Sequence, residues 1–267
     1  MKLDPHIAKR PALKIRLAQC PQEITVAQRL RFRVFHDEMG ALLTPNNIAS
    51  QLDRDEYDEI CDHLLVLAPR ETNHKTEFSV DDGDVVGTYR LLQQSMAERH
   101  QGFYSQTEFD VAPLLKCKSE LRFLELGRSC VLSSFRGTAV VELLWQGIWN
   151  YVREHRLDAM LGCASFDGTD VEKHAEALGF LKQNVIVPDD WKVRAHRHNR
   201  VSIAPLQCSD AKHIISNLPP LIKGYLRLGC YMSEEAVIDQ NFNTTDILVV
   251  LPISAINPRY FARFGAP

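Results

Sequence analysis

The stretch LRFLELGRSCVLSSFRGTAVVELLWQGIWNYVREHR, residues 121–156, decides the fold of this 267-residue chain. Its segment 123–132 has the apolar content of a buried strand. Residues 133–137 (SSFRG) then interrupt the apolar pattern, as a turn would. From residue 138 onward apolar side chains recur at helical spacing. The stretch therefore predicts a strand, a tight turn and a long helix in direct succession.

Two charged residues, Glu125 and Arg128, fall inside the predicted strand. Removing the partner of a buried charge costs roughly 3–5 kcal/mol, so each of these needs a partner or a chemical role. Because they are three positions apart, they should point to opposite faces of the sheet unless a bulge intervenes. One interpretation is buried salt bridges to other elements. The other is a general base, Glu125, beside an anion-binding arginine.

The turn before the predicted helix contains Arg136 and Gly137. Free N–H groups and the positive dipole end of a helix N-terminus suit a phosphate. A phosphate cradle needs glycines where the backbone approaches the ligand, and this turn has one. A plain helix turn and a phosphate site are both consistent with the pattern.

The rest of the chain predicts a mixed α/β fold. Strands are expected at 13–18, 63–68, 85–92, 159–164, 236–239 and 247–251, and further helices at 21–39, 171–180 and 219–229. Strands 63–68 and 85–92 should form an antiparallel hairpin. No composition shift marks a boundary, so we expect one domain, 1–267, with a core at about 13–205 and a C-terminal extension at about 206–267.

Residues 40–62 form a polar segment with six carboxylates. It is either a solvated loop or a mobile acidic flap that recognises a cationic substrate. A site for an amino acid needs carboxylates for the ammonium and an arginine for the carboxylate. The acidic segment, with Arg33 and Arg90 on neighbouring predicted elements, supplies both kinds of group.

Composition excludes several other classes of function. The net charge of −3 and the pI of about 6.4 do not suggest nucleic-acid binding. Seven cysteines without a C-x-x-C pair predict reduced thiols rather than a disulfide framework or structural zinc, and His196 and His198 lack further ligands. The N-terminus has no signal peptide, and the longest apolar run, 247–256, is too short to span a bilayer. We therefore expect a cytoplasmic protein without a bound metal.

Several motifs occur together in a fixed order. They include LRFRVFHDEMGA (30–41), CDHLLVL (61–67), GTYRLL (87–92), LELGRSCVL (124–132) with FRG, and LPPLIKGYLRLGCYM (218–232). This set resembles the GNAT-type N-acyltransferases, and more narrowly their ornithine-lipid branch, some of whose members are called haemolysin-like. The acyl-homoserine-lactone synthases share a sparser version. The resemblance implies a mostly antiparallel mixed sheet flanked by helices, and transfer of a 3-hydroxyacyl group from acyl carrier protein to the α-amine of L-ornithine.

Carried over residue by residue, the resemblance implies a defined set of site residues. The substrate-binding set is Arg33, Asp53, Asp55 and Arg90, and the catalytic pair is Glu125 and Arg128, with Asp58 an alternative to Asp55. Glu125 would accept the proton of the amine. Arg128 or Arg90 would hold the ornithine carboxylate or brace the acidic loop, and Asp53 or Asp55 would meet the δ-ammonium. A splayed strand pair would polarise the thioester carbonyl through backbone N–H groups.

The helix start departs from the pattern of relatives that use coenzyme A. Ala139 and Val141 stand where that pattern has small, glycine-like residues for a pyrophosphate. Acyl carrier protein brings a single phosphodiester, so the departure favours acyl carrier protein as the partner and its thioester as co-substrate. Arg136 and Gly137 would meet that phosphate, and no bound cofactor is expected.

Three classes of function stay open at this point. The chain is an ornithine N-acyltransferase, an acyltransferase with another amino acid or a lactone-type signal as product, or an idle module that binds acyl carrier protein or membrane. The helix at 219–229 would either contact the inner face of the cytoplasmic membrane or pack on the core.

Overall fold

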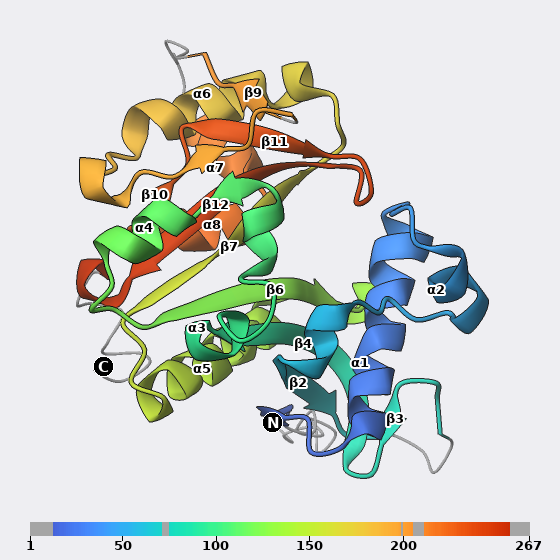
Figure 1. Ribbon diagram of the computed structural model, residues 1–267. Helices are drawn as coiled ribbons and strands as arrows, with labels where there is room; N and C mark the ends of the chain where they lie inside the picture. The colour runs from blue at the N-terminus through green and yellow to red at the C-terminus, as the bar shows by residue number, and fades with distance from the viewer. Residues whose placement is uncertain (1–12, 71–74, 199, 205–210, 257–267) are drawn as a thin grey trace, which may run out of the picture.

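The computed structural model describes residues 13–70, 75–198, 200–204 and 211–256, which build a ten-stranded sheet with helices on both faces (Figure 1). The strands are β1 (Lys14–Leu17), β2 (Asp62–Ala68), β3 (Ser79–Val80), β4 (Gly83–Gln93), β5 (Phe109–Asp110), β6 (Phe123–Val131), β7 (Ala159–Asp167), β8 (Arg194–Ala195), β9 (Arg200–Ser202), β10 (Tyr231–Met232), β11 (Glu235–Asp239) and β12 (Thr244–Pro252). The helices are α1 (Pro21–Phe32), α2 (Pro45–Ser50), α3 (Gln94–Ala97), α4 (Ala112–Cys117), α5 (Thr138–Glu154), α6 (Ala175–Asn184), α7 (Ala211–Asn217) and α8 (Pro220–Leu228).

The order of strands in the main sheet is β1-β2-β4-β6-β7-β12-β11-β9, with β3 paired to β4 and β10 to β12. All these pairs are antiparallel except β6 with β7. Strands β5 and β8 form a separate two-stranded sheet. The mixed, mostly antiparallel α/β fold predicted from the sequence is confirmed.

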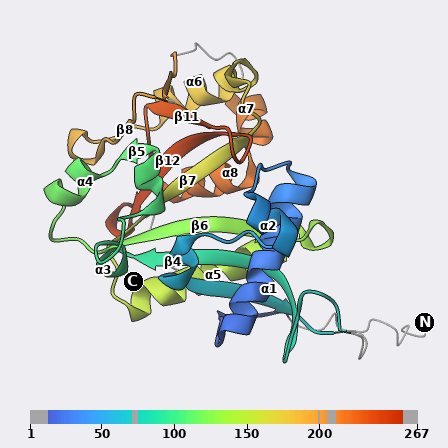
Figure 2. The same ribbon diagram turned by 45° about the vertical axis from the view of Figure 1, so that its right-hand side comes forward.

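Helices cover the two faces of the sheet with different sets of side chains. Alternate residues of β2 divide between the faces: Leu65 and Leu67 pack with α1, whereas Leu64 and Val66 belong to the cluster that includes α5. Helices α7 and α8 lie behind β7 and β12 (Figure 2). Because both faces are covered, the strands read as continuous apolar runs.

Strands β6 and β7 separate after a short paired stretch. Their parallel register covers only three pairs, from Phe123↔Ala159 to Glu125↔Leu161, although both strands continue for several residues. The two strands start together at the left of Figure 1 and diverge toward the right. At the point of divergence a Cβ on Gly162 would stand 2.3 Å from the carbonyl oxygen of Leu126. Glycine therefore permits the close approach at which the split begins.

Several boundaries differ from the sequence prediction. The helix expected at 171–180 begins with a 3-10 turn at Val171–His174 and is α-helical over Ala175–Asn184, and the strand expected at 247–251 spans Thr244–Pro252. The helix expected at 21–39 is α-helical only to Phe32 and continues as a π-helical segment, η1 (Arg33–Glu38). The strand expected at 159–164 extends to Asp167. From the region expected as a C-terminal extension, β12 pairs with β7 over nine positions inside the main sheet.

Helix α8 resolves one alternative left by the sequence. Ile222 and Tyr225 are buried, and α8 packs against β7 and β12. Its apolar side thus contributes to the core. None of the helices in the described ranges has the length and apolar character needed to cross a bilayer.

Candidate active site

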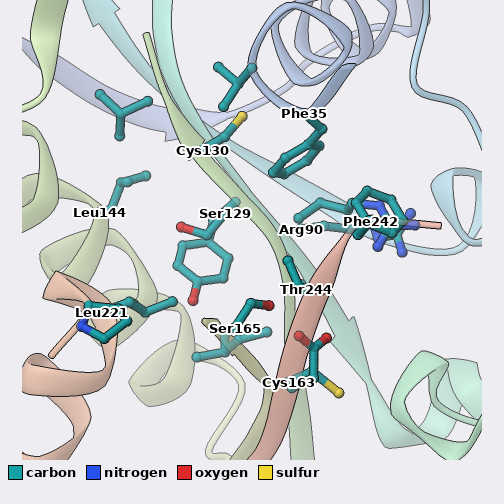
Figure 3. A pocket seen from close by; sticks show the side chains of 18 of the residues that line it. Phe35, Arg90, Ser129, Cys130, Leu144, Cys163, Ser165, Leu221, Phe242 and Thr244 are labelled. Atoms are coloured by element: carbon teal, nitrogen blue, oxygen red, sulfur yellow. The ribbon is translucent and has the colours of Figure 1, made fainter. Parts of the chain in front are cut away.

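A cavity of about 450 Å³ opens where β6 and β7 diverge. Figure 3 shows Leu144 and Leu221 on one side of it and Arg90 and Phe242 on the other. The cavity therefore combines an apolar wall, supplied largely by α5 and α8, with a charged wall. This arrangement suits a substrate pair with one apolar and one ionic member.

A β-bulge in β6 directs Arg128 toward the charged wall. Thr88 pairs with Cys130 and Arg90 with Gly127, so that Arg128 and Ser129 together stand opposite the single residue Tyr89. Arg128 has φ +52°, in the left-handed region that non-glycine residues rarely adopt. The bulge that the sequence analysis allowed for falls at Arg128 and Ser129, while the register from Glu125 to Gly127 is regular.

Three arginines and three aspartates form a closed ring of ion pairs beside the cavity. In order around the ring, which we call the arginine–aspartate ring, the members are Arg31, Asp53, Arg128, Asp55, Arg90 and Asp58. The shortest N···O distances in that order, returning to the start, are 2.9, 3.4, 3.1, 2.5, 3.2 and 2.8 Å. Each arginine pairs with two aspartates and each aspartate with two arginines, so the formal charges cancel.

Burial and aromatic contacts hold the ring in place. Burial raises the pKa of Asp58, but the charge and hydrogen bonds of Arg31, together with the charges of Arg90 and His63, outweigh burial and keep that pKa well below its usual range. The guanidinium carbon of Arg128 lies 4.5 Å from the ring centre of Tyr104 and 4.4 Å from that of Phe242. Asp55 and Asp58 also hold the turn η2 (Glu56–Glu59) through reciprocal side-chain to backbone hydrogen bonds.

The ring contains three of the four predicted substrate-binding residues and Arg128 of the predicted catalytic pair, and it leaves Arg33 out. Asp53, Asp55, Arg90 and Arg128 are ring members, whereas the Arg33 side chain is 57% exposed and pairs with Asp37. Asp53 is buried and pairs with Arg31 and Arg128. This part of segment 40–62 is therefore neither a solvated loop nor a free acidic flap.

Sequence reasoning missed Arg31 and left Asp58 as an alternative to Asp55. Arg31 lies four residues after Ala27 and three before Val34, both of which are buried, and its own side chain is 1% exposed. Residues spaced by three or four positions share one face of a helix, so the buried Ala27 and Val34 place Arg31, rather than Arg33, on the buried face.

Glu125 lies at the start of the split and lines the cavity. Its Oε2 accepts the N–H of Tyr104 and its Oε1 that of Ser105, each at 2.7 Å. Burial raises the pKa of Glu125, while the bonds from Ser105 and Tyr104 and the charge of Arg90 act to lower it. The net shift is upward, which is the direction a proton acceptor for an ammonium requires.

The predicted phosphate site stands at the other edge of the cavity. Gly137 is the N-cap of α5, with no side-chain cap on the helix N-terminus. Arg136 lines the cavity, donates to the Val131 carbonyl oxygen at 3.1 Å and pairs with Glu38. Val141 is 39% exposed and also lines the cavity.

A row of polar side chains crosses the floor of the cavity on β7, β12 and β11. Asp246 stands opposite Ser165, and Thr244 stands opposite Asp167 on one side and Asp239 on the other. We call these five residues, Ser165, Asp167, Asp239, Thr244 and Asp246, the acidic strip; all of them line the cavity. The alternation of apolar and polar residues over 164–167 (ASFD) was the available signal, but the strand is predicted from the sequence to end at residue 164.

Asp246 of the strip also belongs to a group of three side chains whose ligand atoms are close enough to contact one cation. Ligand atoms of Glu108, Cys163 and Asp246 lie within 4.8 Å of one another. The Cys163 thiol donates to Glu108 Oε2 at 3.3 Å. Burial raises the pKa values of both Glu108 and Asp246, and the negative charge of nearby aspartates adds to the effect.

The chain is similar to several known proteins. A family model described as an acetyltransferase (GNAT) domain matches residues 30–146. Two curated proteins named L-ornithine N(alpha)-acyltransferase are similar over almost the whole chain. The one from Brucella abortus is 46% identical, covering 96% of this chain and 89% of the relative, and the one from Rhizobium meliloti is 47% identical, covering 95% and 84%. Among solved structures, FeeM, an N-acyl amino acid synthase from uncultured soil microbes, is 12% identical with a TM-score of 0.47, covering 95% of this chain and 99% of its own.

The sheet, the split between β6 and β7 and the matching domain define an acyltransferase with the GNAT fold. The identity of 46–47% over most of both chains also identifies the family within this fold. The chain belongs to the L-ornithine N(alpha)-acyltransferase family.

Proposed function

We propose that this protein transfers a 3-hydroxyacyl group from acyl carrier protein to the α-amine of L-ornithine, giving a lyso-ornithine lipid. The observation that carries the proposal is the two-sided cavity at the strand split, with an apolar wall beside a charged wall, in a chain 46% identical to a protein named for ornithine N-acylation. The apolar wall suits an acyl chain, and the charged wall suits a zwitterionic amino acid.

In the proposed mechanism Glu125 takes a proton from the α-ammonium, directly or through water, and the neutral amine attacks the thioester carbonyl. A C–N bond forms, the C–S bond breaks, and the thiolate leaves and is protonated. Backbone N–H groups of β6 beyond Glu125, where β7 no longer pairs with it, would polarise the carbonyl oxygen. Holding both substrates in one cavity supplies the remaining acceleration.

Acyl carrier protein is proposed as the donor because the start of α5 offers a restricted phosphate site. Gly137 is the one glycine there, and Val141 projects into the cavity. A single phosphodiester needs fewer contacts than a pyrophosphate, and Arg136 supplies a cation beside the helix N-terminus. Equal catalytic efficiency with matched acyl-carrier-protein and coenzyme A thioesters would contradict this part of the proposal.

The direct test is a lipid extract from a heterologous bacterium that expresses the chain, grown with isotope-labelled ornithine and analysed by mass spectrometry. A labelled 3-hydroxyacyl-ornithine is expected. A different N-acyl amino acid, or an acyl-lactone signal, would retain the acyltransferase and change the acceptor. A folded protein that yields no new acylated product would overturn the proposal.

The role of Glu125 is tested by Glu125→Gln, with the exposed Glu120→Gln as the matched control. Glutamine has a single acceptor oxygen where Glu125 receives two N–H groups, so circular dichroism must first show that the variant is folded. A fall in kcat of about 100-fold or more is expected for a lost general base. Near-normal turnover would remove Glu125 from this role.

The proposed product is an amphiphile, so we also propose that the protein works at the inner face of the cytoplasmic membrane. Sedimentation with vesicles that contain anionic lipid tests this. A protein that stays in the supernatant at low salt, with and without acyl donor, would contradict it.

A further inference from the structure

The acidic strip carries negative charge that the surrounding protein does not neutralise. Within the described ranges, no lysine or arginine lies within ion-pair distance of Asp239, Asp246 or Glu108. The cavity arginines Arg90 and Arg128 are already paired in the arginine–aspartate ring. The strip is therefore short of a cation.

Two buried polar atoms of the strip also lack hydrogen-bond partners. Asp246 Oδ1 and Thr244 Oγ1 have no partner within 3.5 Å among the described residues, although the nearby Thr244 and Ser165 hydroxyls act to lower the pKa of Asp246. Asp246 and Thr244 are 5% and 3% exposed. They lie two positions apart on β12, so both project from the same face into the cavity. A buried polar atom without a partner is costly, which points to a ligand that supplies the missing donors.

The chemistry of the strip favours an alkylammonium over a metal ion. An ammonium offers three N–H donors and one positive charge, which match a carboxylate oxygen, a hydroxyl and a second carboxylate at Asp239. A metal site built on Glu108, Cys163 and Asp246 would need a thiolate, whereas the Cys163 thiol keeps its proton and donates it to Glu108. Burial raises the pKa of that thiol well above its usual range.

We propose that Asp246, Thr244 and Asp239 bind the side-chain ammonium of the amino-acid acceptor and thereby select a diamino acid over a neutral one. This inference rests on the proposed function and names the part of the site that reads the acceptor side chain. The δ-ammonium of ornithine resembles that of lysine, whose pKa is about 10, and is charged at neutral pH. The sequence had suggested Asp53 or Asp55 for this contact, but both are paired with arginines in the ring.

The test compares L-ornithine with L-norvaline, which has the same carbon skeleton without the side-chain amine. With purified full-length protein and an acyl-carrier-protein donor, kcat/KM for ornithine should exceed that for norvaline by about 100-fold. Asp246→Asn should lower this ratio at least tenfold through the KM of ornithine, with the KM of the donor unchanged. Thr244→Val should lower it less, by about threefold to tenfold, and provides a second variant if the first does not fold.

Asp170→Asn is the matched control, since Asp170 is an exposed aspartate just beyond β7 that pairs with Lys173. It should leave the ratio unchanged. An unchanged ratio in Asp246→Asn, with ornithine still acylated, would overturn the inference and leave the proposed function standing. A wild type that acylates neither amino acid would overturn the proposed function instead.

A binding measurement without the acyl donor tests the ammonium site independently of the proposed acyl transfer. Ornithine should raise the melting temperature of the wild type more than norvaline does, and Asp246→Asn should lose this difference. Stabilisation by Zn²⁺ or Mg²⁺ in place of ornithine would overturn the assignment of the strip to an ammonium.

Discussion

The arginine–aspartate ring and the acidic strip place buried carboxylates on two sides of one cavity with opposite electrostatic outcomes. In the ring every carboxylate contacts two guanidinium groups. In the strip Asp246 is 5% exposed and has an oxygen without a partner. The same residue type is therefore internally neutralised in one region and left for a ligand in the other.

The difference teaches how to separate positioning carboxylates from recognition carboxylates. A buried charge that is fully paired fixes geometry, here the place of Arg128 at the bulge, and has little capacity left for a ligand. A buried charge without a partner destabilises the free protein and is retained only where something else gains from it. Stability measurements can distinguish the two regions.

The largest expected effect follows from opening the ring. Arg31→Met leaves Asp53 and Asp58 buried with one cation fewer, and should lower the free energy of unfolding by about 3–5 kcal/mol. Urea denaturation measures the change. The control is Arg33→Met, which removes only an exposed pair with Asp37 and should cost about 0.5 kcal/mol or less. Equal losses in the two variants would show that the ring does not hold this part of the fold.

The pH dependence of stability should also separate the regions. The pKa of Asp246 is raised to about 6 and that of Glu108 to about 8, so above about pH 4 the folded state retains protons that the unfolded chain releases. Stability should therefore fall as pH rises through this window, by about 1.4 kcal/mol per pH unit for each retained proton. The lowered pKa of Asp58 acts in the opposite direction, since its contribution is lost as pH falls below about 4. Urea midpoints from pH 3 to pH 9 measure both limbs, and stability that keeps rising from pH 5 to pH 8 would contradict the contribution assigned to the strip.

Asp246→Asn should act on stability with the opposite sign to Arg31→Met. Removing a buried charge that lacks a cation should raise the free energy of unfolding at pH 7 by about 1–2 kcal/mol, while ornithine recognition is lost. The variant should also show a weaker decline of stability between about pH 4 and pH 6. A destabilised Asp246→Asn protein would mean that the carboxylate has a structural partner.

The smallest effect concerns the aromatic side chains that flank Arg128. Phe242→Leu keeps an apolar side chain but removes one face of the sandwich around the guanidinium, and should cost about 0.5–1 kcal/mol. Thermal unfolding measures it, with Phe135→Leu, an exposed phenylalanine, as the control. A shift in the control as large as in Phe242→Leu would exclude the cation–π contact as the cause.

The sequence was sufficient for the strand, turn and helix of 121–156 because apolar periodicity is local. It was also sufficient for Asp53, Asp55, Arg90 and Arg128 as a group, through the resemblance to a family. The sequence prediction was wrong at Arg33. Arg31 and Arg33 are two positions apart and therefore lie on different sides of the helix, and the buried side is that of Arg31.

The acidic strip could not be predicted because its members come together only through long-range pairing. Asp246 on β12 pairs with Ser165 on β7, although the two residues are about 80 positions apart in the sequence. Each residue alone reads as an ordinary polar position on a strand. The bulge at Arg128 was foreseen only as an exception to strand alternation, since nothing in the local sequence requires a positive φ there.

The place of β12 inside the sheet has a consequence for how the protein is made. Strand β12 pairs with β7 on one side and β11 on the other, and it carries Thr244 and Asp246. A nascent chain that has not yet emerged past Pro252 therefore has an unpaired edge on β7 and lacks the part of the cavity floor that β12 supplies. Strand β6 and helix α5 are made about a hundred residues earlier, but α8, which supplies the rest of the apolar wall, ends only at Leu228. The cavity is therefore completed only when β12 has been made, and β7 presents an unpaired edge until then.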